Sequence, residues 1–329
     1  MASRRDPSRR TTAKELPRRL VDELLAAATA APSMHNTQPW RFRVNQDMIE
    51  VRADPERMLL ITDPTSRAVH IACGAAVLNL RLAAAVAGRE PVLQILPYPD
   101  QPLLLATVRL AGPHRAGQAE RGLHAAITER HTNRGPFSGR PVPQAALAEL
   151  ADAARVEGGI LHLLDASETA RVLYLAWVAE RDLLADRAYR AELARWAGGA
   201  RCQDGIPDGS LGPRALRPPA AVREFVPGGP APAGYARFEE HPQLAVLSMP
   251  FGGRAHWLLA GQALQRVLLT ATAHGIAASP LTQPLETGLA RLVADPRTGR
   301  EVPQMILRLG YGPPVPAAPR RPVPEVLDE

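Results

Sequence analysis

The sequence predicts an α+β fold built from two similar halves within one chain. Three observations predict it. Helical and strand-like segments alternate, the order helix, strand, helix, strand occurs twice, and the long apolar helices of the two halves align without a gap. The chain has 329 residues, 46% of them hydrophobic and 22% charged, which is typical of a globular protein. This length allows two domains or one duplicated unit.

The first half is predicted to contain two helices and two strand regions. Leucines and alanines at helical spacing predict a helix over 16–31, which Pro32 ends. Strand regions are expected over 40–51 and 103–110. Residues 68–88 form the longest apolar stretch. Its polar residues and one-sided pattern indicate a buried core helix rather than a membrane span, so we expect no membrane partner.

The second half repeats this order. We expect helices over 143–154, 170–196 and 256–275 and strands over 160–164, 244–248 and 305–309. When Gly74 is set on Gly261, the long helices align throughout and Gly88 falls on Gly275. Alanine-rich helices also resemble one another by chance, but the shared order of elements favours a duplication.

These patterns divide the chain into a basic flexible tail and two repeats. The tail is expected over 1–15, the first repeat over 16–118 and the second over 119–329. The offset between matching helices of the two repeats grows by roughly 60 residues along the chain, which indicates an insertion in the second repeat. Its segment 198–234 is dense in glycine and proline and cannot form regular structure. Such a segment is typical of a lid over a site or of a disordered loop.

The formal charge of +6 comes almost wholly from arginine, since Lys14 is the only lysine. Arginine favours anionic partners such as phosphate, although coding bias in a GC-rich genome also produces arginine-rich chains. The basic tail has no aromatic platform or recognition motif behind it, so we expect no nucleic-acid partner.

The cysteines and the N-terminus bear on the cellular compartment. Cys73 and Cys202 lie far apart and outside any metal-binding spacing, which predicts neither a disulfide framework nor a metal site. The basic tail lacks the apolar core of a secretory signal. We therefore expect a cytoplasmic protein.

The strongest local motif lies between the first predicted helix and the first strand. Residues 31–40 read Ala-Pro-Ser-Met-His-Asn-Thr-Gln-Pro-Trp. This short polar loop can hydrogen-bond a planar polar ligand, but it also suits a plain capping turn. His35 lies inside the loop, and we expect it to face solvent rather than a ligand.

Three further segments carry candidate binding groups. In Arg130-His131-Thr132-Asn133-Arg134, two guanidinium groups flank a hydroxyl, an arrangement that suits either an anion cradle or a solvated turn. Arg320-Arg321 is a basic pair near the C-terminus. Pro280-Leu281-Thr282 follows the second long helix.

Together these motifs resemble the nitroreductase superfamily. Residues 31–40 match its APSxxNxQPW signature almost letter for letter, and 130–134 is similar to its RRSxR segment. The resemblance implies an FMN cofactor and one FMN phosphate site, formed by Arg130, Thr132, Arg134, Arg320 and Arg321. It implies contacts with the flavin ring from Pro32, Ser33, Met34 and Asn36. By position, Pro280, Leu281 and Thr282 would add backbone groups, although the acidic residue and glycine common there are absent.

The motifs are shared out between the two repeats. Members of this family are two-fold dimers with FMN at the interface. Here the first repeat has the PSxxN loop without the cradle, whereas the second has the cradle but carries 154–159 in place of that loop. This pattern resembles the Acg-type branch and implies one FMN per chain, bound by a monomer that imitates the dimer. Further self-association remains open.

The resemblance implies two-electron transfer from NAD(P)H through FMN to a small nitroaromatic or quinone-like acceptor. The flavin N5 carries this chemistry, so no catalytic side chain is expected. The alternative is a non-turnover flavin binder, for FMN storage, sequestration or redox sensing under stress. In that case the segment 198–234 would cover the flavin and exclude nicotinamide.

Overall fold

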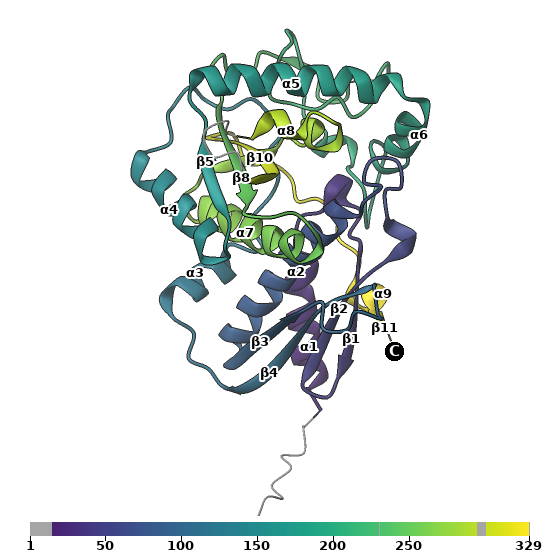
Figure 1. Cartoon of the computed structure of the whole chain (residues 1–329), viewed down its shortest axis with the longest axis vertical. Coiled ribbons are helices and arrows are strands. Elements are labelled where there is room, and N and C mark those ends of the chain that lie inside the picture. The colour runs from purple at the N-terminus through teal and green to yellow at the C-terminus, as the bar shows by residue number, and fades with distance from the viewer. Residues whose placement is uncertain (1–14, 230, 295–300, 329) are drawn as a thin grey trace, which may run out of the picture.

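The computed structural model describes residues 15–229, 231–294 and 301–328. Two sheets lie on either side of a central pair of long helices, α2 (Arg67–Val86) and α7 (Arg254–Ala273) (Figure 1). This α+β architecture agrees with the sequence prediction. The predicted basic tail lies outside the described residues except for Glu15.

The first sheet has five strands in the order β11-β1-β2-β4-β3. They are β1 (Trp40–Asn45), β2 (Met48–Ala53), β3 (Arg89–Ile95), β4 (Leu104–Pro113) and β11 (Leu327–Asp328). Helix α1 (Arg18–Thr29) packs with α2 on this sheet, where Trp40 and Phe42 alternate into the core. The C-terminal strand β11 pairs in parallel with β1, so the end of the chain completes the first sheet.

The second sheet is antiparallel in the order β5-β8-β10-β9. Its strands are β5 (Ile160–Leu163), β8 (Gln243–Met249), β9 (Ala277–Pro280) and β10 (Val302–Gly310). Ala245 and Leu247 of β8 pack with α4 (Gln144–Val156) and α7. Leu244 and Val246 face the opposite side and pack with α5 (Ala166–Ala185). Helices therefore cover both faces of this sheet.

The long helices meet at the two glycines that the sequence alignment pairs. A Cβ atom on Gly74 would lie 2.1 Å from the carbonyl oxygen of Leu258, and one on Gly261 would lie 2.0 Å from that of Ile71. The same alignment sets Ile71 on Leu258, so the two contacts are reciprocal. Such reciprocity is what a two-fold dimer interface has, and a duplicated chain folded on itself would reproduce it.

Several elements differ from the sequence prediction. The predicted helix 170–196 is two helices, α5 and α6 (Arg187–Trp196), because Asp186 has an extended backbone and its carboxylate caps α6 by accepting from the amide of Ala188. The sequence pattern also misses β3, β9 and α3 (Gln118–Ala125). Strand β3 lies at a sheet edge and contains Pro91, so its burial pattern is weak.

The remaining elements are short. They are η1 (Met34–Asn36), η2 (Pro55–Arg57), η3 (Asp208–Ser210), β6 (Arg214–Ala215), β7 (Tyr235–Ala236), η4 (Gln283–Glu286), α8 (Ala290–Val293) and α9 (Val323–Val326). The glycine- and proline-rich segment is largely irregular, as its composition predicts; its described residues, 198–229 and 231–234, include η3 and the two residues of β6.

Within the described ranges, α2 is the one helix long and apolar enough to cross a membrane. In this fold 89% of its most apolar window is buried. Its position between α1, α3 and α7 is that of the core helix expected from the sequence.

Candidate functional site

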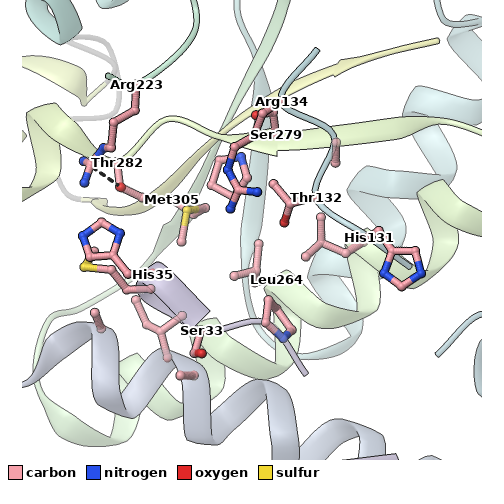
Figure 2. Close-up of a pocket in the computed structure, with 18 of the residues that line it drawn as sticks. Ser33, His35, His131, Thr132, Arg134, Arg223, Leu264, Ser279, Thr282 and Met305 are labelled. Carbon is pink, nitrogen blue, oxygen red and sulfur yellow. Dashed lines mark hydrogen bonds between the residues drawn. The ribbon is translucent and has the colours of Figure 1, made fainter. Parts of the chain in front are cut away.

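A pocket lies where the two halves of the molecule meet. Its wall combines the loop after α1 and the start of α2 with the 130–134 segment and the later turns of α7. It encloses about 1120 Å³ of space, part of it open to solvent. In Figure 2, Thr132 and Arg134 face Ser33 across this space, while Arg223, Thr282 and His35 lie toward one end and His131 toward the other. This is the site that the motifs predict.

The loop after α1 reaches the pocket in an uncommon backbone conformation. His35, Asn36 and Gln38 have φ values of 50°, 56° and 52°, in the left-handed region that side chains other than glycine rarely adopt. The Ser33 hydroxyl accepts a hydrogen bond from the amide of Gln38 at 2.9 Å, which closes the turn. Strain of this kind persists where the surroundings fix it, and it is frequent at functional sites.

Side chains of the loop join it to distant parts of the chain. Asn36 donates from Nδ2 to the carbonyl oxygens of Gly205, in the insertion, and Pro319, both at 2.9 Å. Gln38 donates to the carbonyl of Gln203 at 2.8 Å. The loop therefore holds the insertion and the C-terminal segment at the edge of the pocket.

Two arginines of the second repeat converge beside this loop of the first repeat. Arg130 and Arg320 each donate from Nη2 to the carbonyl oxygen of Ala30, at 3.2 Å. Arg320 also donates from Nη1 to Oδ1 of Asn36 at 3.0 Å. The cradle of the second repeat and the PSxxN loop of the first thus belong to one site.

Three arginines at the pocket have no carboxylate partner among the described residues. Within the described part of the chain, Arg130, Arg134 and Arg320 form no ion pair. Burial and the neighbouring Arg320 and Arg134 lower the pKa of Arg130 to about 9. Burial and the charge of Arg223 lower the pKa of Arg134 to about 10, and burial alone lowers that of Arg320 to about 10.

The Nε atoms of Arg130 and Arg320 are buried and have no hydrogen-bond partner in the part of the chain described. Burying an unneutralised cation is costly, and an anion bound beside this cluster would offset that cost.

The insertion covers part of the pocket. Ile206, Val222, Arg223 and Phe225 all contribute to its wall. The guanidinium of Arg134 lies over the Phe225 ring at 5.2 Å, and Arg223 donates to Thr282 at 3.3 Å and to Glu286 at 2.5 Å. Because Glu286 neutralises Arg223, this arginine can line the pocket without an added anion.

His35 is buried, with 5% of its surface exposed, and it lines the pocket. The expectation that it faces solvent is wrong, because the left-handed turn directs its side chain inward. Its ring packs edge-on against Phe225 at 6.0 Å. Burial, followed by the charges of Arg223 and Arg134, lowers its pKa well below the usual value, so the imidazole is neutral.

Most of the predicted site residues line the pocket: Pro32, Ser33, Met34, Arg130, Thr132, Arg134, Pro280 and Thr282. Asn36 and Arg320 lie directly behind the wall and hold it in place.

Two predicted residues lie elsewhere. Leu281 follows β9; its side chain is 1% exposed in the core beside α5, and its amide, one of the backbone groups predicted to serve the flavin, donates instead to the carbonyl of Ile306 at 2.9 Å. Arg321 turns away from Arg320, pairs with Asp54 at 3.4 Å and donates to the carbonyl of Glu325 at 2.8 Å. Both positions place these side chains in structural contacts.

Several residues of the wall were not predicted from the sequence, among them Arg67, Arg223, Phe225 and Met305. Arg67 begins α2, and its charge at the start of an apolar helix is a usable signal. Arg223 and Phe225 lie in the irregular insertion, where no periodicity or motif marks them.

Comparisons with known proteins bear on the family of this chain. The Nitroreductase family model matches residues 1–60 and 127–311. The Mycobacterium tuberculosis protein Rv3131, provisionally named an NAD(P)H nitroreductase, is 34% identical over 315 residues, which cover 94% of this chain and 91% of Rv3131. The protein acg of the same organism, with the same provisional name, is 30% identical over 322 residues, which cover 94% of this chain and 95% of acg.

A solved structure gives the same result for the fold. A provisionally named nitroreductase from Anabaena variabilis aligns with a TM-score of 0.52 at 12% identity, over 91% of this chain and 90% of its own. The chain therefore belongs to the Nitroreductase family, which confirms the family and the fold predicted from the sequence.

Proposed function

We propose that the pocket binds one FMN and that the protein passes two electrons from NAD(P)H to a small nitroaromatic or quinone-like acceptor. The observation that carries the proposal is the group of buried and half-buried arginines beside the PSxxN loop. Arg130, Arg134 and Arg320 have no carboxylate partner in the described chain, and a phosphate monoester supplies the missing negative charge.

The residues present fit this cofactor. Arg130, Thr132 and Arg134 would hold the phosphate, with Arg320 adding charge behind them. Pro32, Ser33 and Met34 would lie beside the ring. When bound, the flavin supplies the redox chemistry. The protein orients the ring, keeps the arginines out of water and so strengthens their hold on the phosphate.

The nicotinamide donor is proposed from the names of the relatives, which are NAD(P)H nitroreductases. The test is to load the protein with FMN, remove unbound flavin and follow NADPH or NADH oxidation with menadione and with nitrofurazone. We expect a yellow protein whose turnover depends on the acceptor. A colourless protein that FMN cannot load would overturn the proposal.

The alternative, a non-turnover flavin protein, has one structural observation in its favour. Four insertion residues form part of the wall, so this segment can act as a lid that keeps nicotinamide from the flavin. Deleting 198–234 is a poor test, because Ile206 and Leu211 belong to a buried cluster with Tyr189 and Leu193 of α6.

Phe225→Ala is the better variant, since it removes the ring contacts with His35 and Arg134 and, of the buried cluster, only the packing of one partly buried ring at its edge. If the lid blocks access, flavin reduction by NADPH in rapid-mixing experiments should accelerate in Phe225→Ala. An unchanged rate in a folded, loaded variant would remove the lid from the proposal and favour turnover.

The pseudo-symmetric second site is closed in a way that supports one FMN per chain. Setting Gly74 on Gly261 places Arg81 on Leu268, which lines the pocket. Arg81 pairs with Glu157 at 2.8 Å, and Arg266 pairs with the same carboxylate at 2.5 Å. Glu157 belongs to the segment that replaces the PSxxN loop. In our proposal, its ion pairs therefore fill the place that corresponds to the pocket in the other repeat. We propose that repeats 16–118 and 119–329 act as one monomeric unit.

A further inference from the structure

His35 carries a buried polar atom that nothing in the described chain satisfies. Its Nε2 atom is inaccessible to solvent and has no hydrogen-bond partner among the described residues, although the ring lines the pocket. An unsatisfied buried donor or acceptor costs about 1–3 kcal/mol. Figure 2 shows the ring at the end of the pocket occupied by Arg223 and Thr282, away from His131.

The loop holds His35 in this position at a further cost. The residue has φ 50° and ψ 20°, and the neighbouring Asn36 is also left-handed. Asn36 fixes the turn through its bonds to Gly205 and Pro319, 169 and 283 residues away in the chain. Long-range contacts thus stabilise a strained turn that buries an unpaired imidazole, which is the pattern of a preorganised ligand contact.

The surroundings of the ring define what it can bind. The charged groups that act on it, Arg134 and Arg223, are both cationic and keep the imidazole neutral. A neutral imidazole nitrogen can donate or accept one directed hydrogen bond. The ring also has an apolar neighbour, Phe225, in an edge-on contact. This combination suits a polar atom on the edge of a flat ring.

We propose that Nε2 of His35 hydrogen-bonds an edge oxygen or nitrogen of the planar ligand in this pocket. The inference rests on the proposed FMN site and extends it to a residue outside the phosphate cradle. Two ligands offer this chemistry: the flavin ring and a bound nitroaromatic or quinone acceptor. His35 is then a ligand-contacting residue that sets ring position or acceptor preference.

The experiment compares the wild type with His35→Phe and His35→Gln. Phenylalanine retains a flat ring without a polar atom, whereas glutamine retains a polar nitrogen near the Nε2 position. His274→Gln is the remote control, since His274 pairs with Glu149 on the surface. For each protein the thermal midpoint without ligand, the visible spectrum and Kd of FMN, and the Kd of 4-nitrobenzoate for the FMN-loaded form are measured without NADPH.

The proposal expects His35→Phe to keep or raise the midpoint of the ligand-free protein, because the change removes an unsatisfied atom. If His35 had only a structural role, its substitution would lower the thermal midpoint. Binding should weaken 5- to 100-fold in His35→Phe, the range of one buried hydrogen bond, and be largely restored in His35→Gln. A changed FMN spectrum and Kd assign the contact to the flavin; a change confined to 4-nitrobenzoate assigns it to the acceptor.

His35→Phe with wild-type spectrum and both Kd values unchanged would overturn the inference and leave the FMN proposal standing. Wild-type protein that does not bind FMN would overturn both.

Discussion

At the scale of single residues, the partner of an arginine decides whether it can serve a ligand. Arg320 and Arg321 are neighbours, yet Arg320 has no carboxylate in the described chain while Arg321 pairs with Asp54. Arg223 lines the pocket but is neutralised by Glu286. Arginines without a carboxylate partner among the described residues, such as Arg320, are therefore the ones available to bind an anion. Paired arginines, such as Arg321 and Arg223, hold the surrounding segments in place.

The cradle gives the first prediction. Replacing Arg130 and Arg134 together with alanine should weaken FMN binding by about 10²- to 10⁴-fold, because each charge-assisted bond contributes about 1.5–3 kcal/mol. The measurement is the Kd of FMN by fluorescence quenching. Arg109→Ala, at an exposed position on β4, is the matched control and should bind as the wild type. Full flavin occupancy in the double variant would count against the cradle.

The motifs predict the cradle and the loop from sequence because both are local patterns of chemical groups. The inward direction of His35 is not predictable in this way. It depends on left-handed backbone angles that Pro319 and Gly205 impose through Asn36, and these partners lie far along the chain. The same holds for Arg321, whose role follows from the position of Asp54.

At the scale of elements, the crossing of α2 and α7 positions the site. Residues from the start of α2 and the end of α7 line the pocket, so the angle and separation of these helices set its width. The sequence predicts both helices and pairs Gly74 with Gly261, since their apolar pattern is long and regular. The sequence alone cannot show that each glycine lies against the backbone of the other helix.

Gly74→Ala tests this crossing. The new methyl would lie 2.1 Å from a backbone oxygen that cannot move independently, so unfolding free energy should fall by about 3 kcal/mol or more. Gly122→Ala in α3 is the control, because its methyl would meet nothing within 4 Å and should add about 0.5–1 kcal/mol. Denaturant titration measures both. Equal stability of the two variants would contradict a close crossing.

The start of α2 carries a pH-dependent contact. Asp63 accepts a hydrogen bond from the amide of Val69 at 3.1 Å, and burial raises its pKa to about 6 from 3.8. The folded state then binds more protons than the unfolded state between these values. The stabilising contribution of protonated Asp63 is therefore present below pH 3.8 and is lost as the pH rises through 6.

Asp63→Asn should flatten this dependence. The difference in unfolding free energy between variant and wild type should change by about 2.4 kcal/mol from pH 4 to pH 7, in favour of the variant at the higher pH. Denaturant titrations at pH 4, 5, 6 and 7 provide the values. A constant difference across this range would show that Asp63 titrates normally.

At the scale of the whole molecule, two unequal halves form one site. The second sheet is covered on both faces because α5 and the insertion follow β5, and the insertion reaches the pocket. The C-terminal segment returns to the first sheet through β11, and on the way it brings Arg320 to the loop after α1. Sequence periodicity cannot reveal this return, because β11 has only two residues and its partner is at the other end of the chain.

This asymmetry makes the number of flavins a test of the architecture. A nitroreductase-like pair of equal halves would have two equivalent places, and we propose that the ion pairs of Glu157 with Arg81 and Arg266 fill one of them here. We expect 1 FMN per chain, measured by flavin absorbance after denaturation against protein concentration and by native mass spectrometry. Two FMN per chain would show that the ion pairs do not close the second place. One FMN shared by two chains would show that the halves do not act as a monomeric unit.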